Sequence, residues 1–462
     1  MIEIDGRVEL EKDDIAHAYI TLQEQTKIYN ENKEYVKGKN PKTLRQKRRK
    51  DPDNRIPVPL AKSAVTDMAG YAGSDIRMTY EGINEVDEGK LDEYKMLMRE
   101  FEDHNDDDII TSRLYKESLS HIETYLIMWT SDDLALDSGM VTPEYTVVGM
   151  DQVVIIWDDK LKPEKIAGCY FVQHESNGEK EIICTVYYPG YSEKWTGNGS
   201  DWKKVDEINE YPFTKVPIVV FQMSLDGGPL FQAEKPLIDS HDSVLSKGQN
   251  EVDRYNALVL LLPELADPEF VKKLEEHKVI DNLGSSERWP EYLEKNLSGV
   301  TDYVNRHMDR LERLFHKTIK VVDFNQITAQ GGDESGVARA FKLLGMEFLA
   351  SEIEKVFIKG FYERQQLLND IIAASTMSLP LEDFTMRVDM KRNLPIDELS
   401  KVNIATALKG LGVSNETILK ILPNTLIPEP EKEAELMRKA DDRRTENFQN
   451  MLNGNNDADS IS

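Results

Sequence analysis

The stretch that decides the fold runs from Asp323 to Glu347 and reads DFNQITAQGGDESGVARAFKLLGME. Its first half is polar and contains Gly331 and Gly332, so it predicts a loop. Its second half begins a run of apolar residues at helical spacing, which predicts a long helix over 336–375. Another long helical pattern precedes the loop. A polar loop between two long helices is typical of a segment with a mechanical role, and no catalytic motif lies within it.

Two amphipathic helices are predicted before that loop, over about 237–262 and 300–322. Each carries its apolar residues on one side, so each needs a neighbour to cover that side. Copies of the same chain standing side by side would supply such neighbours. The residues expected to make these contacts from the second helix are Val304, Met308, Leu311, Phe315 and Ile319.

The other patterns predict an α+β protein that is mainly helical. A β-rich module is expected over 140–222, because short β-branched and aromatic runs alternate there with turn residues. In the long helix, Gly345 and Gly360 are interpreted as points where the helix can bend. Ser414 is interpreted as a helix N-cap, and the polar tail 451–462 is expected to be disordered. Further helices are predicted over 10–37, 59–73, 91–131 and parts of 396–450, and a strand over 384–388.

The chain has 462 residues and a formal net charge of −27. Such a surface repels free nucleic acid, because duplex binding needs clustered Lys and Arg. It fits either an ordinary acidic cytoplasmic protein or a surface that lies beside DNA without holding it tightly. Cys169 and Cys184 show no metal-binding spacing and are expected to be reduced, buried thiols. No signal peptide and no 18-residue apolar run is found, so no membrane contact is expected.

Two charged clusters have two interpretations each. The basic run Arg45–Lys50 is either a contact for phosphate or an acidic partner, or a solvated loop. The acidic run Asp106–Asp108 comes where a helix is expected to begin. Acids stabilise a helix N-terminus without any metal, whereas the spacing of a calcium-binding loop is absent. Capping is therefore the favoured interpretation.

No known catalytic motif is present. The sequence lacks a phosphate-binding GxxxxGK[ST] loop, a GxSxG nucleophile turn and an HExxH zinc motif. The eight histidines include no i, i+4 pair. We therefore expect no catalytic, cofactor-binding or metal-binding residue. The alternative is an acidic cytoplasmic enzyme with a site in the β-rich module around Trp157, Tyr170 and Tyr187.

Four stretches together resemble the portal proteins of tailed bacteriophages, of the type found in long non-contractile-tailed phages of Gram-positive hosts. The resemblance covers roughly residues 15–445 and depends on the order and spacing of the stretches. They are NRIPVPLAK at 54–62 with Gly70-Tyr71, LIDSHDSVLS at 237–246 with Leu258-Val259-Leu260, SGVARAFKLLGME at 335–347, and RNLP at 392–395 followed by KGLGVS at 409–414 and Leu419 to Pro423.

The resemblance implies an elongated subunit of a ring of about twelve copies, through whose axis double-stranded DNA is packaged and ejected. It implies a β-rich wing, a two-helix stem, a small α/β clip, a long kinked helix and a helical crown. In this sequence the parts would be the wing (1–236, and 376–395 as its returning strand), stem helices (237–262 and 300–322), clip (263–299), tunnel loop (323–335), long wing helix (336–375) and crown (396–450).

The resemblance also implies partners and a location. These are the terminase motor, the scaffold and major capsid protein, a head-completion or adaptor protein at the clip, and the portal vertex of the virion after assembly in the host cytoplasm. The tunnel loop has no Lys or Arg between 324 and 334, so it can touch phosphates without a strong attraction; the alternative is a plain connection between helices. The residues expected to face DNA are Asn325, Gln326, Thr328, Gln330, Gly331 and Gly332.

Overall fold

The computed structural model describes residues 2–3, 9–40, 53–83, 87–135, 141–176, 179–199, 201–224, 227–256, 260–261, 291–292, 298–323, 336–375, 379–393, 405–421, 433–439 and 443. The chain divides into two compact units. The first comprises Met1–Asp333 and Arg339–Arg392, and the second comprises Glu334–Ala338 and Asn393–Ser462. Both helices and sheets are present, as the sequence predicts.

The β-rich module forms two sheets, and every strand pair in them except one is antiparallel. The larger sheet has the order β1-β5-β6-β7-β8-β9, in which only the β1–β5 pair is parallel. The smaller sheet has the order β10-β3-β4. The strands are β1 (Ile2–Glu3), β3 (Thr124–Ala135), β4 (Val141–Gly149), β5 (Val153–Trp157), β6 (Lys165–Ser176), β7 (Glu179–Tyr188), β8 (Tyr191–Gly197), β9 (Trp202–Glu210) and β10 (Ile218–Phe221).

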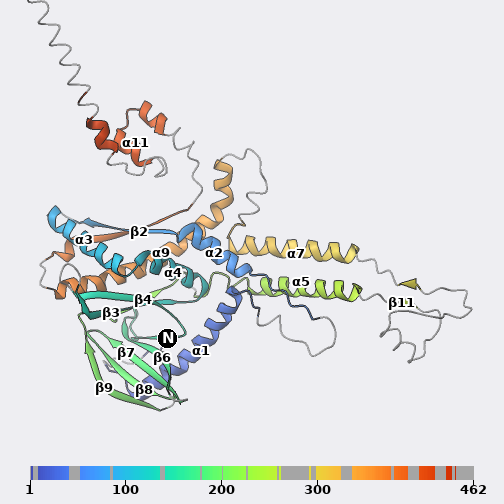
Figure 1. Cartoon of the computed structure of the whole chain (residues 1–462), viewed down its shortest axis with the longest axis horizontal. Helices are drawn as coiled ribbons and strands as arrows, with labels where there is room; N and C mark the ends of the chain where they lie inside the picture. Colours follow the sequence, from blue (N-terminus) through green and yellow to red (C-terminus); the bar gives the residue numbers. More distant parts are fainter. Residues whose placement is uncertain are drawn as a thin grey trace, which may run out of the picture. The chain divides into compact units, whose positions relative to one another are not determined.

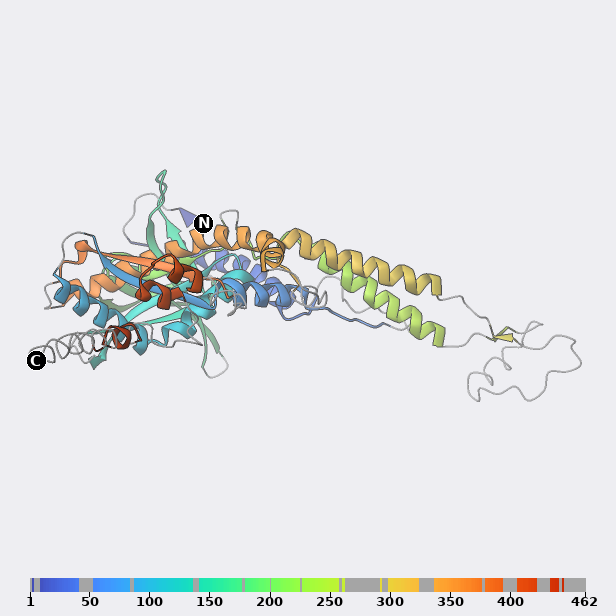
Figure 2. The same cartoon turned by 90° about the horizontal axis from the view of Figure 1, so that it is seen from above.

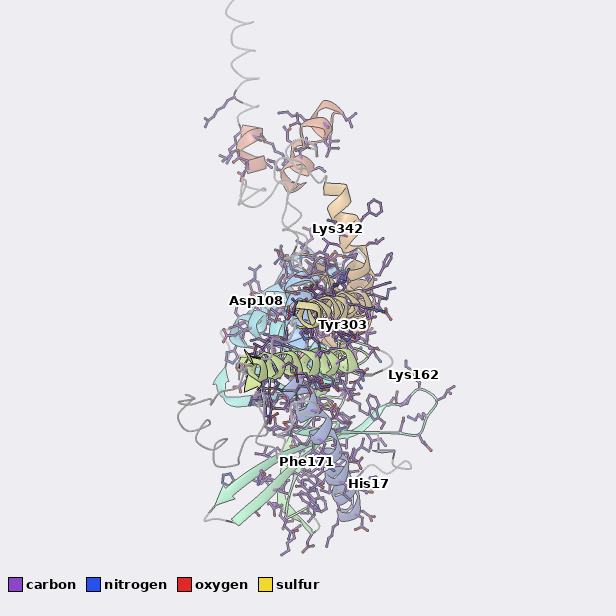
Figure 3. The ribbon with its side chains drawn as sticks, turned by 90° about the vertical axis from the view of Figure 1, so that its right-hand side faces the viewer. His17, Asp108, Lys162, Phe171, Tyr303 and Lys342 are labelled. Atoms are coloured by element: carbon purple, nitrogen blue, oxygen red, sulfur yellow. The ribbon has the colours of Figure 1, made fainter. Side chains whose placement is uncertain are left out.

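One long helix covers the larger sheet. Helix α1 (Lys12–Val36) places Ile15, Ala18 and Leu22 on one face, at the three- and four-residue spacing of an amphipathic helix. These side chains pack in one cluster with Phe171 of β6 and its neighbours. Figure 3 shows α1, marked by His17, beside the strand that carries Phe171. The free thiols of Cys169 and Cys184 are buried in the same cluster, as predicted.

The main core lies among four helices and a two-stranded sheet (Figure 1). Helix α9 contributes Phe357 and Phe361, which pack edge-on against each other. Phe357 is tilted against Phe221 of β10, and Phe361 packs edge-on against it. The predicted strand over 384–388 is confirmed. The elements around this core are α2 (Leu60–Ala72), α3 (Glu88–His104), α4 (Asp107–Ser120), α9 (Gly336–Ala374), and the antiparallel pair β2 (Asp75–Gly82) and β13 (Phe384–Lys391), with the short helix η1 (Leu381–Asp383) before β13.

Two predicted helices were wrong in their extent. The helical pattern predicted over 91–131 ends at Ser120, because the apolar run that follows pairs with β4 and β10 as strand β3. The helix start expected at Asp106–Asp108 is confirmed, since α4 begins at Asp107. The helix predicted over 237–262 is α5 (Lys235–Asn256), and Leu260–Leu261 form strand β11 with β12 (Glu291–Tyr292) instead. Gly360, interpreted as a point where the helix can bend, is also a packing position, since a Cβ atom there would lie 2.5 Å from the ring of Phe221.

The second unit contains short helices. Residues 405–410 and 433–439 are helical, and α11 spans Asn415–Ile421. The Ser414 hydroxyl accepts a hydrogen bond from the Thr417 backbone N–H at 3.4 Å, so the predicted N-cap is confirmed. Ala405, Ile418 and Leu419 are buried. The tail 451–462 lies outside the described residues.

Candidate functional site: the paired helices α5 and α7

Helices α5 and α7 (Ser298–Ile319) lie side by side along their length (Figures 1 and 2). The five residues of α7 expected to contact a neighbouring copy occupy an arc of about 80° at 100° per residue, here called the apolar arc. Three of the five residues expected to contact a neighbouring copy, Leu311, Phe315 and Ile319, are buried within the same chain, and Phe315 and Ile319 belong to its main core. The other two, Val304 and Met308, are only partly buried.

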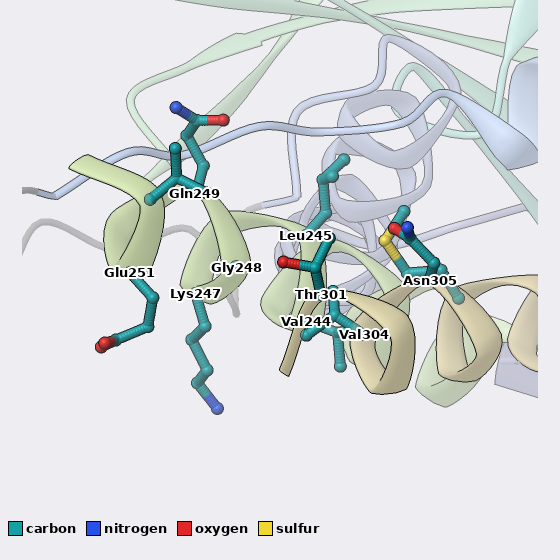
Figure 4. A pocket seen from close by; sticks show the side chains of 11 residues that line it. Val244, Leu245, Lys247, Gly248, Gln249, Glu251, Thr301, Val304 and Asn305 are labelled. Atoms are coloured by element: carbon teal, nitrogen blue, oxygen red, sulfur yellow. The ribbon is translucent and has the colours of Figure 1, made fainter. Parts of the chain in front are cut away.

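A groove of about 330 Å³ lies between the two helices (Figure 4). Its walls are largely apolar, and Gly248 forms part of its floor. A Cβ atom on Gly248 would lie 3.2 Å from Val304, so the glycine lets α7 approach α5 closely. The groove is lined by Val244, Leu245, Lys247, Gly248, Gln249, Glu251 and Val252 of α5, and by Thr301, Val304, Asn305 and Met308 of α7.

A buried histidine joins the pair at the end nearer the core. His241 of α5 is 1% exposed, and its Nε2 lies 3.2 Å from Oε1 of Glu312 on α7. Its Nδ1 lies 3.7 Å from Oδ1 of Asp242. Burial lowers the pKa of His241, but its interactions with Asp242 and Glu312 outweigh burial and raise the pKa above its ordinary value. The imidazolium therefore stabilises the helix pair.

A second feature of α5 is a row of polar side chains that holds an extended segment. The backbone N–H groups of Asn54, Ile56 and Val58 donate to Oδ1 of Asn250 (2.7 Å), Oγ of Ser246 (3.0 Å) and Oδ1 of Asp242 (2.9 Å). Two residues of extended chain span about 6.6 Å, and four residues of helix rise about 6 Å. The two spacings match, so alternate residues of the segment meet successive turns of α5.

The sequence analysis missed this row of hydrogen bonds, although the sequence contains a signal for it. Pro57 and Pro59 alternate with the donating residues, and proline has no backbone N–H that would need an acceptor. On the helix, Asp242, Ser246 and Asn250 follow one another at four-residue steps. The row anchors the segment that directly follows the basic run Arg45–Lys50, which itself lies outside the described residues.

The predicted tunnel loop also lies outside the described residues, except for Asp323. This includes all six residues expected to face DNA, namely Asn325, Gln326, Thr328, Gln330, Gly331 and Gly332. The described chain on either side is α7, which ends at Ile319, and α9, which begins at Gly336. Most of the predicted clip, 263–299, is likewise outside the described residues.

The acidic run has a role that neither interpretation included. Asp107 points inward and accepts a hydrogen bond from the buried guanidinium of Arg364 on α9. Asp106 is the N-cap residue of α4 and has a left-handed backbone, with φ of 51°. Among the described residues, no three His, Cys, Asp or Glu side chains lie where they would hold a metal ion.

The aromatic residues of the alternative enzyme hypothesis pack together with a small cluster of the β-rich module. Trp157, Tyr170 and Tyr187 are partly buried there. The Nζ of Lys165 lies 6.0 Å from the ring centroid of Trp157 and forms an ion pair with Glu363 of α9. Burial lowers the pKa of Lys165, and the charge of Glu363 opposes this. The arrangement joins the sheet to α9 and gives no separate support to catalysis.

Within the described residues, no helix is both long enough and apolar enough to span a bilayer.

Comparisons with known proteins extend over most of the chain. Chains in the solved structures of a native gene transfer agent virion and of the neck of an empty gene transfer agent particle align with TM-scores of 0.44. Their identities are 12% and 13%, and the alignments cover 88% and 79% of this chain and 99% and 90% of those chains. The portal protein of Clostridium phage phiCD119 is 22% identical over 428 residues, which are 89% of this chain and 90% of that protein.

The sequence model described as "Phage portal protein, SPP1 Gp6-like" matches residues 17–447, which is nearly the whole chain. This range includes the β-rich module, both paired helices and α9. The chain therefore belongs to the SPP1 Gp6-like family of phage portal proteins.

Proposed function

We propose that this chain is the repeating subunit of a ring-shaped portal channel at one capsid vertex, through which double-stranded DNA is packaged and ejected. Membership of the portal family supports the role. The observation that carries the proposal is the open apolar groove between α5 and α7, which a second copy of the chain would cover. A structural role without catalysis fits the same surface.

A ring needs two different faces on each subunit, one for each neighbour. The groove is one such face. The other is the flank of α7 that carries Tyr303, which is 68% exposed and stacks on His307 at 5.9 Å between centroids. By helix geometry Tyr303 lies roughly 140° around α7 from Met308, which lines the groove. The neighbour contact proposed for α7 therefore involves Val304, Met308 and Tyr303, whereas Leu311, Phe315 and Ile319 stabilise the subunit itself.

We assign the remaining parts by the same proposal. The wing would be 1–236 with 336–395, the stem α5 and α7, the clip 263–299 and the crown 396–450. The loop 323–335 would face the duplex through Asn325, Gln326, Thr328, Gln330, Gly331 and Gly332. About twelve copies would form the ring. It would bind terminase, scaffold and major capsid protein during assembly in the host cytoplasm, and an adaptor protein at the clip.

The test is the mass and shape of the purified protein. Multi-angle light scattering is expected to give a large multiple of 52.9 kDa, and negative-stain images to show rings with a central hole. Tyr303→Glu is expected to dissociate the rings, because a carboxylate would enter an apolar contact. Leu161→Glu is the matched control, since Leu161 is fully exposed in a turn between β5 and β6. A wild-type protein that stays monomeric at every concentration and salt would contradict the proposal.

A further inference from the structure

Helix α7 carries a row of basic residues on the face opposite its apolar face. Arg306, Arg310, Arg313 and Lys317 follow one another at steps of four, three and four residues, and all four are exposed. At 100° per residue they fall within an arc of about 60°, centred roughly 170° from the centre of the apolar arc. We call these four residues the basic stripe. Its length along the helix axis is about 16 Å.

The stripe is unusual for this chain, in which 84 acidic residues outnumber 57 basic ones. Within the part of the chain that the structure describes, none of its four residues has an ion-pair partner, although Asp302 and Asp309 lie at its edge. Two of its guanidinium groups hydrogen-bond their own helix: Nε of Arg306 donates to the Asp302 carbonyl (3.3 Å), and Nε of Arg313 to the Asp309 carbonyl (3.1 Å). The positive charges therefore remain available to an anionic partner.

The faces of α7 indicate what that partner is. The apolar arc is used by α5 and the core, and the groove and Tyr303 occupy the two flanks, where neighbouring copies are proposed to lie. The stripe lies opposite the apolar arc, and Tyr303 lies about 20° beyond Arg310 at its edge. In a ring of such helix pairs, this side is left to face the central channel.

We propose that the basic stripe contacts the phosphate backbone of duplex DNA as it moves through the channel. This inference rests on the proposed ring. Arginine and lysine bind phosphate in any sequence context, so the contact reads no bases. Repeated by every subunit, the stripe would form a cationic surface in an otherwise acidic protein. Each neutralised phosphate contributes a modest affinity that salt weakens, which allows a duplex to be centred while it still slides.

The experiment measures binding of a fluorescent, blunt-ended 30-base-pair duplex to assembled rings by anisotropy, across a series of NaCl concentrations. The stripe variant combines Arg310→Gln with Lys317→Gln. The matched control combines Lys355→Gln with Lys359→Gln, because both lysines are exposed on α9 and the change in net charge is the same. A third variant, Arg310→Lys with Lys317→Arg, keeps the charge of the stripe.

Wild-type rings are expected to bind the duplex at low salt. The stripe variant is expected to bind at least tenfold more weakly. The slope of log affinity against log salt should become shallower by roughly 0.9 for each phosphate that the variant no longer neutralises. The control and the charge-keeping variant should stay within about twofold of wild type, since general phosphate contact requires charge more than a particular geometry.

Each other outcome overturns the proposal. Equal weakening in stripe and control variants would show a general charge effect, and unchanged binding would show that the stripe does not touch DNA. Absence of binding by wild-type rings at low salt would lead to the same conclusion. Loss of rings in the stripe variant alone would show that the stripe binds a neighbouring subunit instead. Absence of rings in the wild type would refute the proposed function itself, which is a distinguishable result.

Discussion

Arg364 and Asp107 form a buried ion pair that joins α9 to α4 across 257 residues of sequence. The same Asp107 oxygen accepts a hydrogen bond from the hydroxyl of Tyr145 on β4 at 2.8 Å. The guanidinium also lies 5.2 Å from the ring centroid of Phe361 and 5.5 Å from that of Tyr145. Three elements of the main core therefore meet at one charged contact.

Replacing Arg364→Met is expected to lower the free energy of unfolding by about 3–5 kcal/mol, because it leaves the Asp107 carboxylate buried without its cation. Urea unfolding followed by tryptophan fluorescence measures the change. The control is Lys95→Met, which removes one partner of the exposed Lys95–Asp92 pair and is expected to cost at most about 1 kcal/mol. Equal effects of the two substitutions would show that the buried pair adds little to stability.

The row of hydrogen bonds along α5 gives a prediction at a single amide. Ser246→Ala removes the acceptor for the Ile56 N–H and is expected to destabilise the protein by about 1–3 kcal/mol. Hydrogen exchange should become faster at the Ile56 amide first, because its donor loses its partner. Ser243→Ala on the same helix is the control, since Ser243 makes no side-chain hydrogen bond to any described residue. Unchanged protection of the 53–59 segment in Ser246→Ala would contradict the proposed anchoring.

The His241 contact predicts a pH dependence with a definite sign. Its pKa is raised in the folded protein, so protonation stabilises the fold. That stabilisation is fully present below the unfolded value of about 6.5 and is lost as the pH rises through the folded pKa. The Tm difference between wild type and His241→Gln should therefore be largest near pH 6 and shrink towards pH 9.

Two further variants make that test specific to the helix pair. Glu312→Gln removes the carboxylate on α7 and should reduce the pH dependence while keeping the imidazole in place. His17→Gln, at an exposed position of α1, should give a Tm difference that stays nearly constant over the same range. A difference for His241→Gln that grows with pH would mean that the neutral imidazole is the stabilising form.

Sequence periodicity was sufficient to predict the long helices, but it could not predict contacts between segments that are distant in the sequence. Helices α7 and α9 were predicted to within about three residues because their apolar spacing continues over many turns. Strand β3 was misassigned because its apolar run, Tyr125 to Trp129, has no clear period, and only pairing with β4 and β10 selects a strand. The role of Asp107 could not be predicted, since it depends on Arg364, 257 residues away.

Gly360 shows the same limit and provides a last test. A glycine within a helix suggests bending, yet here it allows the ring of Phe221 to lie against the backbone of α9. Gly360→Ala should destabilise the protein by roughly 1–3 kcal/mol even though alanine favours helix, because Phe221 is fully buried between Phe357 and Phe361 and has no space to move.

The control for this substitution is Gly345→Ala on the same helix. The nearest atom to a Cβ at Gly345 is 3.9 Å away, in ordinary contact, so this change should stabilise the protein by roughly 1 kcal/mol. Adding Phe221→Leu to Gly360→Ala should recover part of the stability, which a double-mutant cycle would measure as a coupling energy. If both glycine substitutions changed the unfolding free energy alike, helix propensity alone would account for them and the packing role of Gly360 would be wrong.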